Sequence, residues 1–255
     1  MKVLFLSNTA GQGHHSTANA LMEMLSAEGA ECKMLDTYAY INPVLYEAIA
    51  RGYLLTTSIT PKAYGGVYRI LEKKDKNDSK YSVINVANSI MSLKLRKYFE
   101  KEFNPDVIVC THIFSAQLVN VMKASGLIKQ KSIGIITDYT IHPFWQDVGH
   151  IDYFVTASEL ITSQAVKRGI PAEKILPFGI PIHHKFSKKV DKTEARRQLG
   201  IDPDLFTILV MSGSMGYGNL SEVLQKMDSL GTDFQILAVC GNNKHAKTKI
   251  DRLKT

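Results

Sequence analysis

The chain has 255 residues, of which 45% are hydrophobic and 22% are charged, with a mean hydropathy of −0.07. This composition excludes a disordered tail, a collagen and a disulfide scaffold, and at roughly 150 residues per domain the length predicts one domain and part of another. The 31 basic against 24 acidic residues give a net charge of +7. That charge favours an anionic partner such as phosphate, nucleic acid or a membrane surface, or it reflects ordinary solvated lysines.

The cysteines and the N-terminus bear on where the protein works. The three cysteines, Cys32, Cys110 and Cys240, form no C-x-x-C pair, which favours a reducing cytoplasm and gives no thiolate metal site. The first apolar run, 3–6, is too short for a signal peptide, and no run approaches the roughly 18 apolar residues that cross a bilayer. We therefore expect a soluble or peripheral cytoplasmic protein.

Short apolar runs recur along the chain, and each is followed by a turn and a helical stretch. Continuous apolar runs are typical of strands that are buried on both faces, and helices between them are typical of parallel crossovers. The pattern predicts an α/β domain with a doubly wound parallel sheet. Its strands are expected at 2–6, 31–35, 107–110, 133–137, 153–156 and 175–178.

Two helices have recognisable ends. The first is expected to begin near Ser16 and to end at Gly29, a natural residue after a helix C-terminus. Its apolar face contains Leu21 among others. A later helix is expected to run from an N-cap at Ser158 to Gly169.

The segment between the second and third strands, about 38–101, is longer than an ordinary crossover. Insertions of this length usually have a binding role. This one combines aromatic and apolar residues with lysines, a composition typical of a segment that lies on an anionic membrane. A helical subdomain whose tyrosines pack in the core is the alternative. The expected membrane contacts are Tyr53, Tyr64, Tyr68, Lys73 and Lys74.

A second, shorter α/β unit follows the first. The charged stretch that begins after residue 181 is poor in large apolar residues and indicates a linker over 182–204. Beyond it we expect a strand at 207–211, a glycine-rich loop, a helix near 220–230 and a strand at 235–240. A doubly wound sheet normally needs about five or six strands, so the second domain, 205–255, is expected to be an incomplete Rossmann-like unit.

The turn after the first strand reads GQGHHS from Gly11 to Ser16. Its glycines let the backbone approach a ligand, and the helix N-terminus that follows attracts negative charge. With Asp36 near the end of the second strand, it is also a weak dinucleotide fingerprint. The helix dipole favours the neutral form of an imidazole at His14 or His15, as a general base requires. A hydrogen-bonded cap is the alternative role for these histidines.

A second group of polar residues, TDYTIHPFW from Thr137 to Trp145, follows the fourth strand. Because the carboxyl ends of parallel strands meet at one edge, Asp138 and His142 should lie on the same rim as the first turn. We expect a carboxylate, several imidazoles and the single tryptophan around one cleft. Capping of the next turn is the alternative role for Asp138. No H-x-x-x-H or H-x-H spacing supports a metal.

Four stretches of the chain, taken in order, resemble the monogalactosyldiacylglycerol synthase family. These family 28 glycosyltransferases include bacterial processive diacylglycerol glucosyltransferases and are related to the peptidoglycan lipid-intermediate glycosyltransferase. The resemblance covers essentially the whole chain. The four stretches are Gly11-Gln12-Gly13-His14, Thr137-Asp138 with His142 and Trp145, Phe178-Gly179-Ile180-Pro181, and the loop 208–218.

The resemblance implies a GT-B architecture of two doubly wound domains. The first, 1–181, would take a diacylglycerol-type lipid and the second a UDP-hexose, with inverting transfer at the cytoplasmic face of the cell membrane. The implied partners are these two substrates and an anionic membrane surface, and no nucleic acid. No metal or other cofactor is expected, because GT-B enzymes hold the diphosphate with backbone N–H groups and helix ends.

His14 matches the position of the family's proposed catalytic base, and Asp138 is expected to position it or the acceptor. An inverting transfer needs such a base to remove the proton of the attacking hydroxyl. The expected acceptor-binding residues are Gly11, Gly13, His15, His142 and Trp145, and the expected nucleotide-sugar-binding residues are Ser212, Gly213, Gly216 and Gly218.

The chain stops before the Gly-Gly turn and the acidic residue with which the family grips the nucleotide sugar. We therefore expect the 255-residue polypeptide by itself to bind UDP-sugar weakly and to be inactive. A non-catalytic membrane-docking module is the first alternative function. An NAD-linked oxidoreductase that relies on Gly11, Gly13 and Asp36 is the second.

Overall fold

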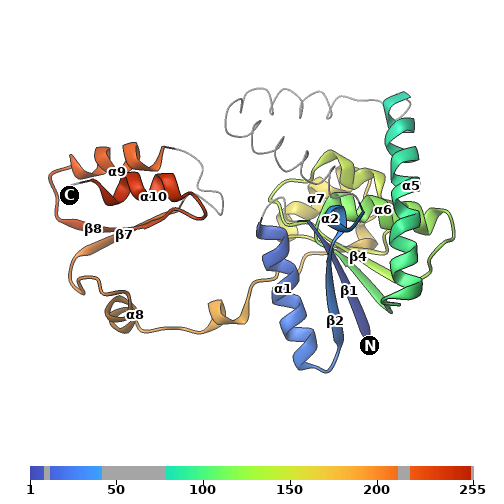
Figure 1. Ribbon diagram of the computed structural model, residues 1–255, viewed down its shortest axis with the longest axis horizontal. Coiled ribbons are helices and arrows are strands. Elements are labelled where there is room, and N and C mark those ends of the chain that lie inside the picture. Colours follow the sequence, from blue (N-terminus) through green and yellow to red (C-terminus); the bar gives the residue numbers. More distant parts are fainter. Residues whose placement is uncertain (9–11, 42–78, 212–218, 254–255) are drawn as a thin grey trace. The chain divides into compact units, whose positions relative to one another are not determined.

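The computed structural model describes residues 1–8, 12–41, 79–211 and 219–253, with the backbone alone for 79–89. The chain divides into two compact units, Met1–Phe186 and Ser187–Thr255. Figure 1 labels their helices and strands. In the described part, no helix is both long enough and apolar enough to cross a membrane.

Among the described residues, the first unit is built on a six-stranded, all-parallel sheet with the order β2-β1-β3-β4-β5-β6. Figure 1 labels β1, β2 and β4 of this sheet. The chain first places β2 on one side of β1 and then adds β3, β4, β5 and β6 in turn on the other side. The direction in which strands are added therefore reverses between β1 and β3. This confirms the doubly wound sheet, although β4 begins and ends two residues earlier than expected and β6 is shorter. The strands are β1 (Lys2–Ser7), β2 (Glu31–Asp36), β3 (Val107–Cys110), β4 (Lys131–Ile135), β5 (Tyr153–Val155) and β6 (Ile175–Leu176).

Strand β1 lies at the centre of the core because both of its faces are apolar. Val3 and Phe5 pack with Ala18 of α1 on one face, and Leu4 and Leu6 pack on the other with the side chains of α5 and α6. Such two-sided burial is what a continuous apolar run predicts. Among the described residues, the helices of this unit are α1 (Gln12–Ala27), α2 (Thr37–Ile41), α5 (Ser79–Lys101), α6 (Ile113–Ala124) and α7 (Glu159–Lys167), with the 3₁₀ helices η1 (Pro143–Asp147), η2 (Ala172–Lys174) and η3 (His184–Ser187).

Helix α1 begins at Gln12, four residues before the expected start near Ser16. The two histidines in its first turn, His14 and His15, both make hydrogen bonds outside the helix. The predicted end is confirmed, since α1 ends at Ala27 and Gly29 follows with a φ of 83°. Ser158 is the residue that precedes α7, as predicted, but its side chain makes no cap hydrogen bond.

The long insertion is described only at its two ends, in α2 and in α5. Tyr98 of α5 is buried in the core and contacts Tyr40 of α2 edge-on at 5.2 Å between ring centroids. These two tyrosines therefore pack as the helical-subdomain alternative requires. All five residues that we expect to contact a membrane, Tyr53, Tyr64, Tyr68, Lys73 and Lys74, lie outside the described residues.

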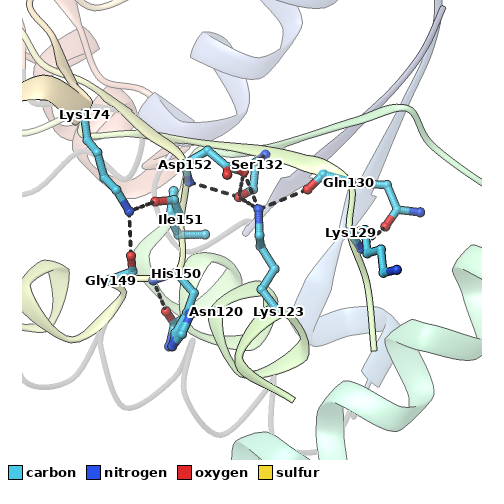
Figure 2. Close-up of polar contacts among 10 residues, drawn as sticks. All are labelled: Asn120, Lys123, Lys129, Gln130, Ser132, Gly149, His150, Ile151, Asp152 and Lys174. Carbon is cyan, nitrogen blue, oxygen red and sulfur yellow. Dashed lines mark hydrogen bonds and ion pairs between the residues drawn. The ribbon is translucent and has the colours of Figure 1, made fainter. Parts of the chain in front are cut away.

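A polar network lies at the edge of this sheet that is formed by the amino ends of the strands, where β4 and β5 begin (Figure 2). Lys123 of α6 forms an ion pair with Asp152 and donates to Ser132 Oγ at 3.2 Å. The Asp152 carboxylate also accepts from the Ser132 backbone N–H at 2.8 Å. Nearby, Lys174 Nζ donates to the Gly149 and Ile151 carbonyls at 2.7 and 2.9 Å. These bonds fix the amino ends of the two strands.

The second unit contains two strands among its described residues, β7 (Phe206–Met211) and β8 (Phe234–Val239), which pair in parallel. They are accompanied by α9 (Leu220–Asp228) and α10 (Lys244–Asp251). The segment 182–204, expected to be a linker, contains the helix α8 (Lys192–Leu199). Asp191 caps this helix by accepting from two backbone N–H groups, and Gly200 ends it with a φ of 66°.

Candidate active site

The first turn of α1 lies at the carboxyl end of β1 and is bound to two neighbouring loops. His15 Nδ1 lies 2.9 Å from the hydroxyl of Ser7, the last residue of β1. His14 Nδ1 lies 2.7 Å from the carbonyl oxygen of Thr111 and 3.1 Å from Thr137 Oγ1. Thr111 follows β3 and Thr137 closely follows β4, so the structure brings together three adjacent strand ends at His14.

The partner of His14 decides which of its ring nitrogens carries the proton. A carbonyl oxygen can only accept a hydrogen bond, so Nδ1 donates to Thr111 and the lone pair of the neutral ring lies on Nε2. Burial lowers the pKa of His14, and the Thr111 carbonyl and the Asp138 charge offset this only in part. His14 is therefore a neutral imidazole with an unprotonated Nε2 near neutral pH, the form that a general base requires.

Asp138 is exposed, and its charge raises the pKa of His14 and of His142. The hydrogen bonds of His14 Nδ1 go to the Thr111 carbonyl and to Thr137 Oγ1. The group that orients His14 is the Thr111 carbonyl, whereas Asp138 acts on the imidazole through its charge.

The segment after β4 holds His142 at the rim and Trp145 in the core. His142 precedes η1 and accepts from the Phe144 N–H at 3.3 Å. Trp145 is only 3% exposed and packs edge-on against Phe154, with ring centroids 6.0 Å apart. This burial contradicts the expectation that Trp145 lines the cleft and contacts the acceptor, because the η1 turn directs its ring into the sheet's core.

His112 is a residue of this site that sequence reasoning missed. It caps the N-terminus of α6, and its ring meets that of His14 edge-on with centroids 4.5 Å apart and an interplanar angle of 77°. Burial, with smaller contributions from His14 and His142, lowers the pKa of His112 to about 3. Its position directly after the third apolar run was the available signal, because all such strand ends meet at one edge.

Asp36, which the oxidoreductase alternative needs for a ribose, has a structural role instead. Its Oδ1 accepts from the Ala39 backbone N–H at 3.0 Å, at the start of α2. A short side chain of this type is a favoured helix cap. Gly13 lies in the first turn of α1, while Gly11, Ser212, Gly213, Gly216 and Gly218 lie outside the described residues.

Among the described residues, Glu23, His183 and His184 form a group whose donor atoms could hold a metal ion. Glu23 of α1 lies 2.7 Å from His183 Nε2 and 2.7 Å from His184 Nδ1. The Lys185 backbone N–H donates to His183 Nδ1 at 3.1 Å, which places the ring proton on Nε2, facing Glu23. The group is thus a hydrogen-bonded bridge, and a metal would have to displace that proton.

Comparison with known proteins identifies the family of this chain. A family model described as monogalactosyldiacylglycerol (MGDG) synthase matches residues 14–182, which include His14, His112, Asp138 and His142. The chain is 27% identical over 233 residues to an uncharacterized glycosyltransferase, YkoN, of Bacillus subtilis, covering 91% of this chain and 59% of that protein.

Two further relatives have names that state an activity. Monogalactosyldiacylglycerol synthase 1 of Arabidopsis thaliana is 27% identical, over 99% of this chain and 49% of its own length. The processive diacylglycerol beta-glucosyltransferase of Bacillus pumilus is 25% identical, over 99% of this chain and 64% of its own length. This chain therefore spans between about half and two thirds of the length of these relatives.

Solved structures show the same fold. Acinetobacter baumannii MurG has a TM-score of 0.54 at 13% identity, covering 98% of this chain and 64% of that one. Anabaena Alr3699/HepE, solved with UDP and glucose, has a TM-score of 0.51 at 11% identity, covering 99% of this chain and 66% of that one. The doubly wound first unit and the α/β unit after it thus define a glycosyltransferase fold of the GT-B class. Within that class, the chain belongs to the monogalactosyldiacylglycerol synthase family.

Proposed function

We propose that the protein transfers a hexose from a UDP-hexose to diacylglycerol or a related lipid, with inversion at the anomeric carbon and His14 as the general base. The observation that supports this most is the hydrogen bond from His14 Nδ1 to Thr111, which leaves Nε2 able to accept a proton. The names of the family and of two relatives support a hexose as the transferred group and diacylglycerol as the acceptor, and the Anabaena structure solved with UDP and glucose supports a UDP-linked donor.

The proposed step is a single displacement. The acceptor hydroxyl oxygen forms a bond to the anomeric carbon while the bond from that carbon to the diphosphate oxygen breaks. His14 Nε2 takes the hydroxyl proton, and UDP leaves with the electron pair of the broken bond. Charge that develops on the diphosphate is stabilised by backbone N–H groups, for which the glycine-rich stretch 212–218 is the candidate.

The transfer takes place at a membrane surface, because its acceptor is a lipid. Peripheral attachment at an anionic surface on the cytoplasmic side is part of this proposal, and the basic aromatic insertion is the candidate contact.

The test is a transfer assay with the product of the complete coding sequence, with diacylglycerol in mixed micelles and UDP-glucose or UDP-galactose as donor. A diacylglycerol glycoside of inverted anomeric configuration is the expected product. A retained configuration excludes the single displacement. Hydrolysis of the UDP-hexose without glycolipid excludes the lipid acceptor.

A further inference from the structure

His112 contacts the proposed base directly but supplies no atom to the proposed reaction. Its ring meets the His14 ring edge-on, with centroids 4.5 Å apart, and is partly buried. A polar ring that is partly removed from water is stabilised by hydrogen-bond partners.

Two donors converge on His112 Nδ1. The Phe114 backbone N–H donates at 3.3 Å, as in a helix cap, and Asn8 Nδ2 donates at 3.1 Å. The Asn8 amide is itself oriented, because its Oδ1 accepts from the Tyr38 backbone N–H at 3.3 Å. A nitrogen that accepts two hydrogen bonds carries no proton, so His112 is neutral with its proton on Nε2.

The position of His112 also sets the direction of the Thr111 carbonyl, because one peptide group joins the two residues. The other side of Thr111 is fixed as well, since its N–H donates to the Leu6 carbonyl of β1 at 3.1 Å. With Thr111 held by its N–H and His112 held by its ring, the carbonyl oxygen of the peptide group between them meets His14 Nδ1 at 2.7 Å.

We propose that His112 is a positioning residue for His14. Held by Asn8 and by the cap of α6, it fixes the Thr111 carbonyl against His14 Nδ1 and covers the His14 ring, so that the unprotonated nitrogen of His14 is Nε2. The proposal rests on the proposed function only where it treats His14 as the base. The placement of the His14 proton is a property of the chain that can be measured without substrate.

Other ionisable groups around the pair must be kept constant in a test. Asp138 raises the pKa of His14 and His15 lowers it, while His142 acts on His112. A variant at position 112 leaves these three groups unchanged. Replacement by asparagine is the sharpest choice, because asparagine is a strong N-cap and can still accept from the Phe114 N–H, while the ring that covers His14 is lost.

The experiment is NMR of the histidine ring nitrogens across a pH titration of the chain. In the wild type we expect His14 to carry its proton on Nδ1 and to titrate below the ordinary histidine pKa. In His112→Asn we expect the pKa of His14 to rise toward the ordinary value and both ring tautomers to be present. His150→Asn, the same change at an exposed site, should alter neither.

An unchanged tautomer and an unchanged pKa of His14 in folded His112→Asn would overturn the proposal. Should that variant fail to fold, Asn8→Ala removes one donor to His112 and leaves both rings in place. It is expected to loosen the contact of the Thr111 carbonyl with His14 Nδ1, so that both ring tautomers of His14 are present, and an unchanged tautomer there overturns the proposal too.

The transfer assay separates this inference from the proposed function. His112→Asn should lower turnover by about 10- to 10²-fold, the size of effect that a misplaced catalytic group produces, and should move the acid limb of the pH profile upward. Wild-type protein that transfers no sugar would remove the proposed function, while the NMR result on His14 would still decide the role of His112.

Discussion

The Nδ1 atom of His14 lies 2.7 Å from the carbonyl oxygen of Thr111, and this contact joins the first turn of α1, which follows β1, to the segment that follows β3. The strand order of the sheet reverses between these two strands. In open α/β sheets, ligands bind at the carboxyl edge where the order reverses. The proposed base therefore lies where the fold places ligands, in the protonation state that base catalysis needs.

The charge of Asp138 gives a prediction about pH. Because the carboxylate stabilises the charged imidazolium, it raises the pKa of His14, and Asp138→Asn should lower that pKa further. Transfer is lost as pH falls through the pKa of the base. The acid limb of the pH profile should thus move to lower pH in Asp138→Asn, with the plateau reduced by less than about 10-fold. Movement of the limb to higher pH would contradict this role.

The close approach of Gly134 and Trp145 gives a prediction about stability. A Cβ atom at Gly134 would lie 2.7 Å from the Trp145 ring and 3.2 Å from the Phe154 ring. Gly134→Ala should therefore lower the free energy of unfolding by about 1–3 kcal/mol, as overpacking of a core does. Urea denaturation measures this change. Gly149→Ala is the matched control, because its Cβ meets no atom within 4 Å, and an equal loss in both variants would refute the packing argument.

The network in Figure 2 predicts how stability depends on pH. Burial alone would raise the pKa of Asp152, but hydrogen bonds from Lys123 and Ser132 outweigh it and lower that pKa. A depressed carboxyl pKa contributes stability above the pKa of the unfolded chain, and this contribution is lost as pH falls through the folded value.

Lys123→Met leaves the partly buried Asp152 carboxylate without its cation, which should cost about 2–3 kcal/mol near pH 7. The difference from wild type should shrink as pH falls through the lowered pKa of the folded Asp152 carboxyl, which then takes up a proton. Lys226→Met removes an exposed pair with Glu222 at 2.8 Å and serves as control, with an expected cost of about 0.5 kcal/mol or less. A cost of Lys123→Met that stays constant with pH would exclude the ion pair as its cause.

Much of the fold could be predicted because buried parallel strands are continuous apolar runs. The start of α1 and the presence of α8 could not be predicted from apolar runs. Helix α1 starts at Gln12, and its first turn contacts Ser7 through His15 and the distant Thr111 through His14, contacts that local patterns do not reveal. Helix α8 was not predicted, because its charged sequence was interpreted as a linker. Asp191 and Gly200 at its two ends are ordinary helix-cap signals.

The candidate site was predictable in part for the same reason. His14, Thr137 and His142 follow strands, so the rule that parallel strand ends meet at one edge placed them together. The same rule applies to His112, which no motif marks. Trp145 shows the limit of that rule, because the turn of η1 decides whether a ring faces the rim or the core, and here it faces the core.

The most direct test of the central claim is the turnover of His14→Ala, measured with UDP-hexose and diacylglycerol in the product of the complete coding sequence. Loss of a general base should lower turnover by about 10²-fold or more, while the affinity for UDP stays near that of wild type. His150→Ala, an exposed histidine near the start of β5, is the control. Turnover of His14→Ala equal to that of wild type, with the protein folded, would contradict the assignment of His14 as the base.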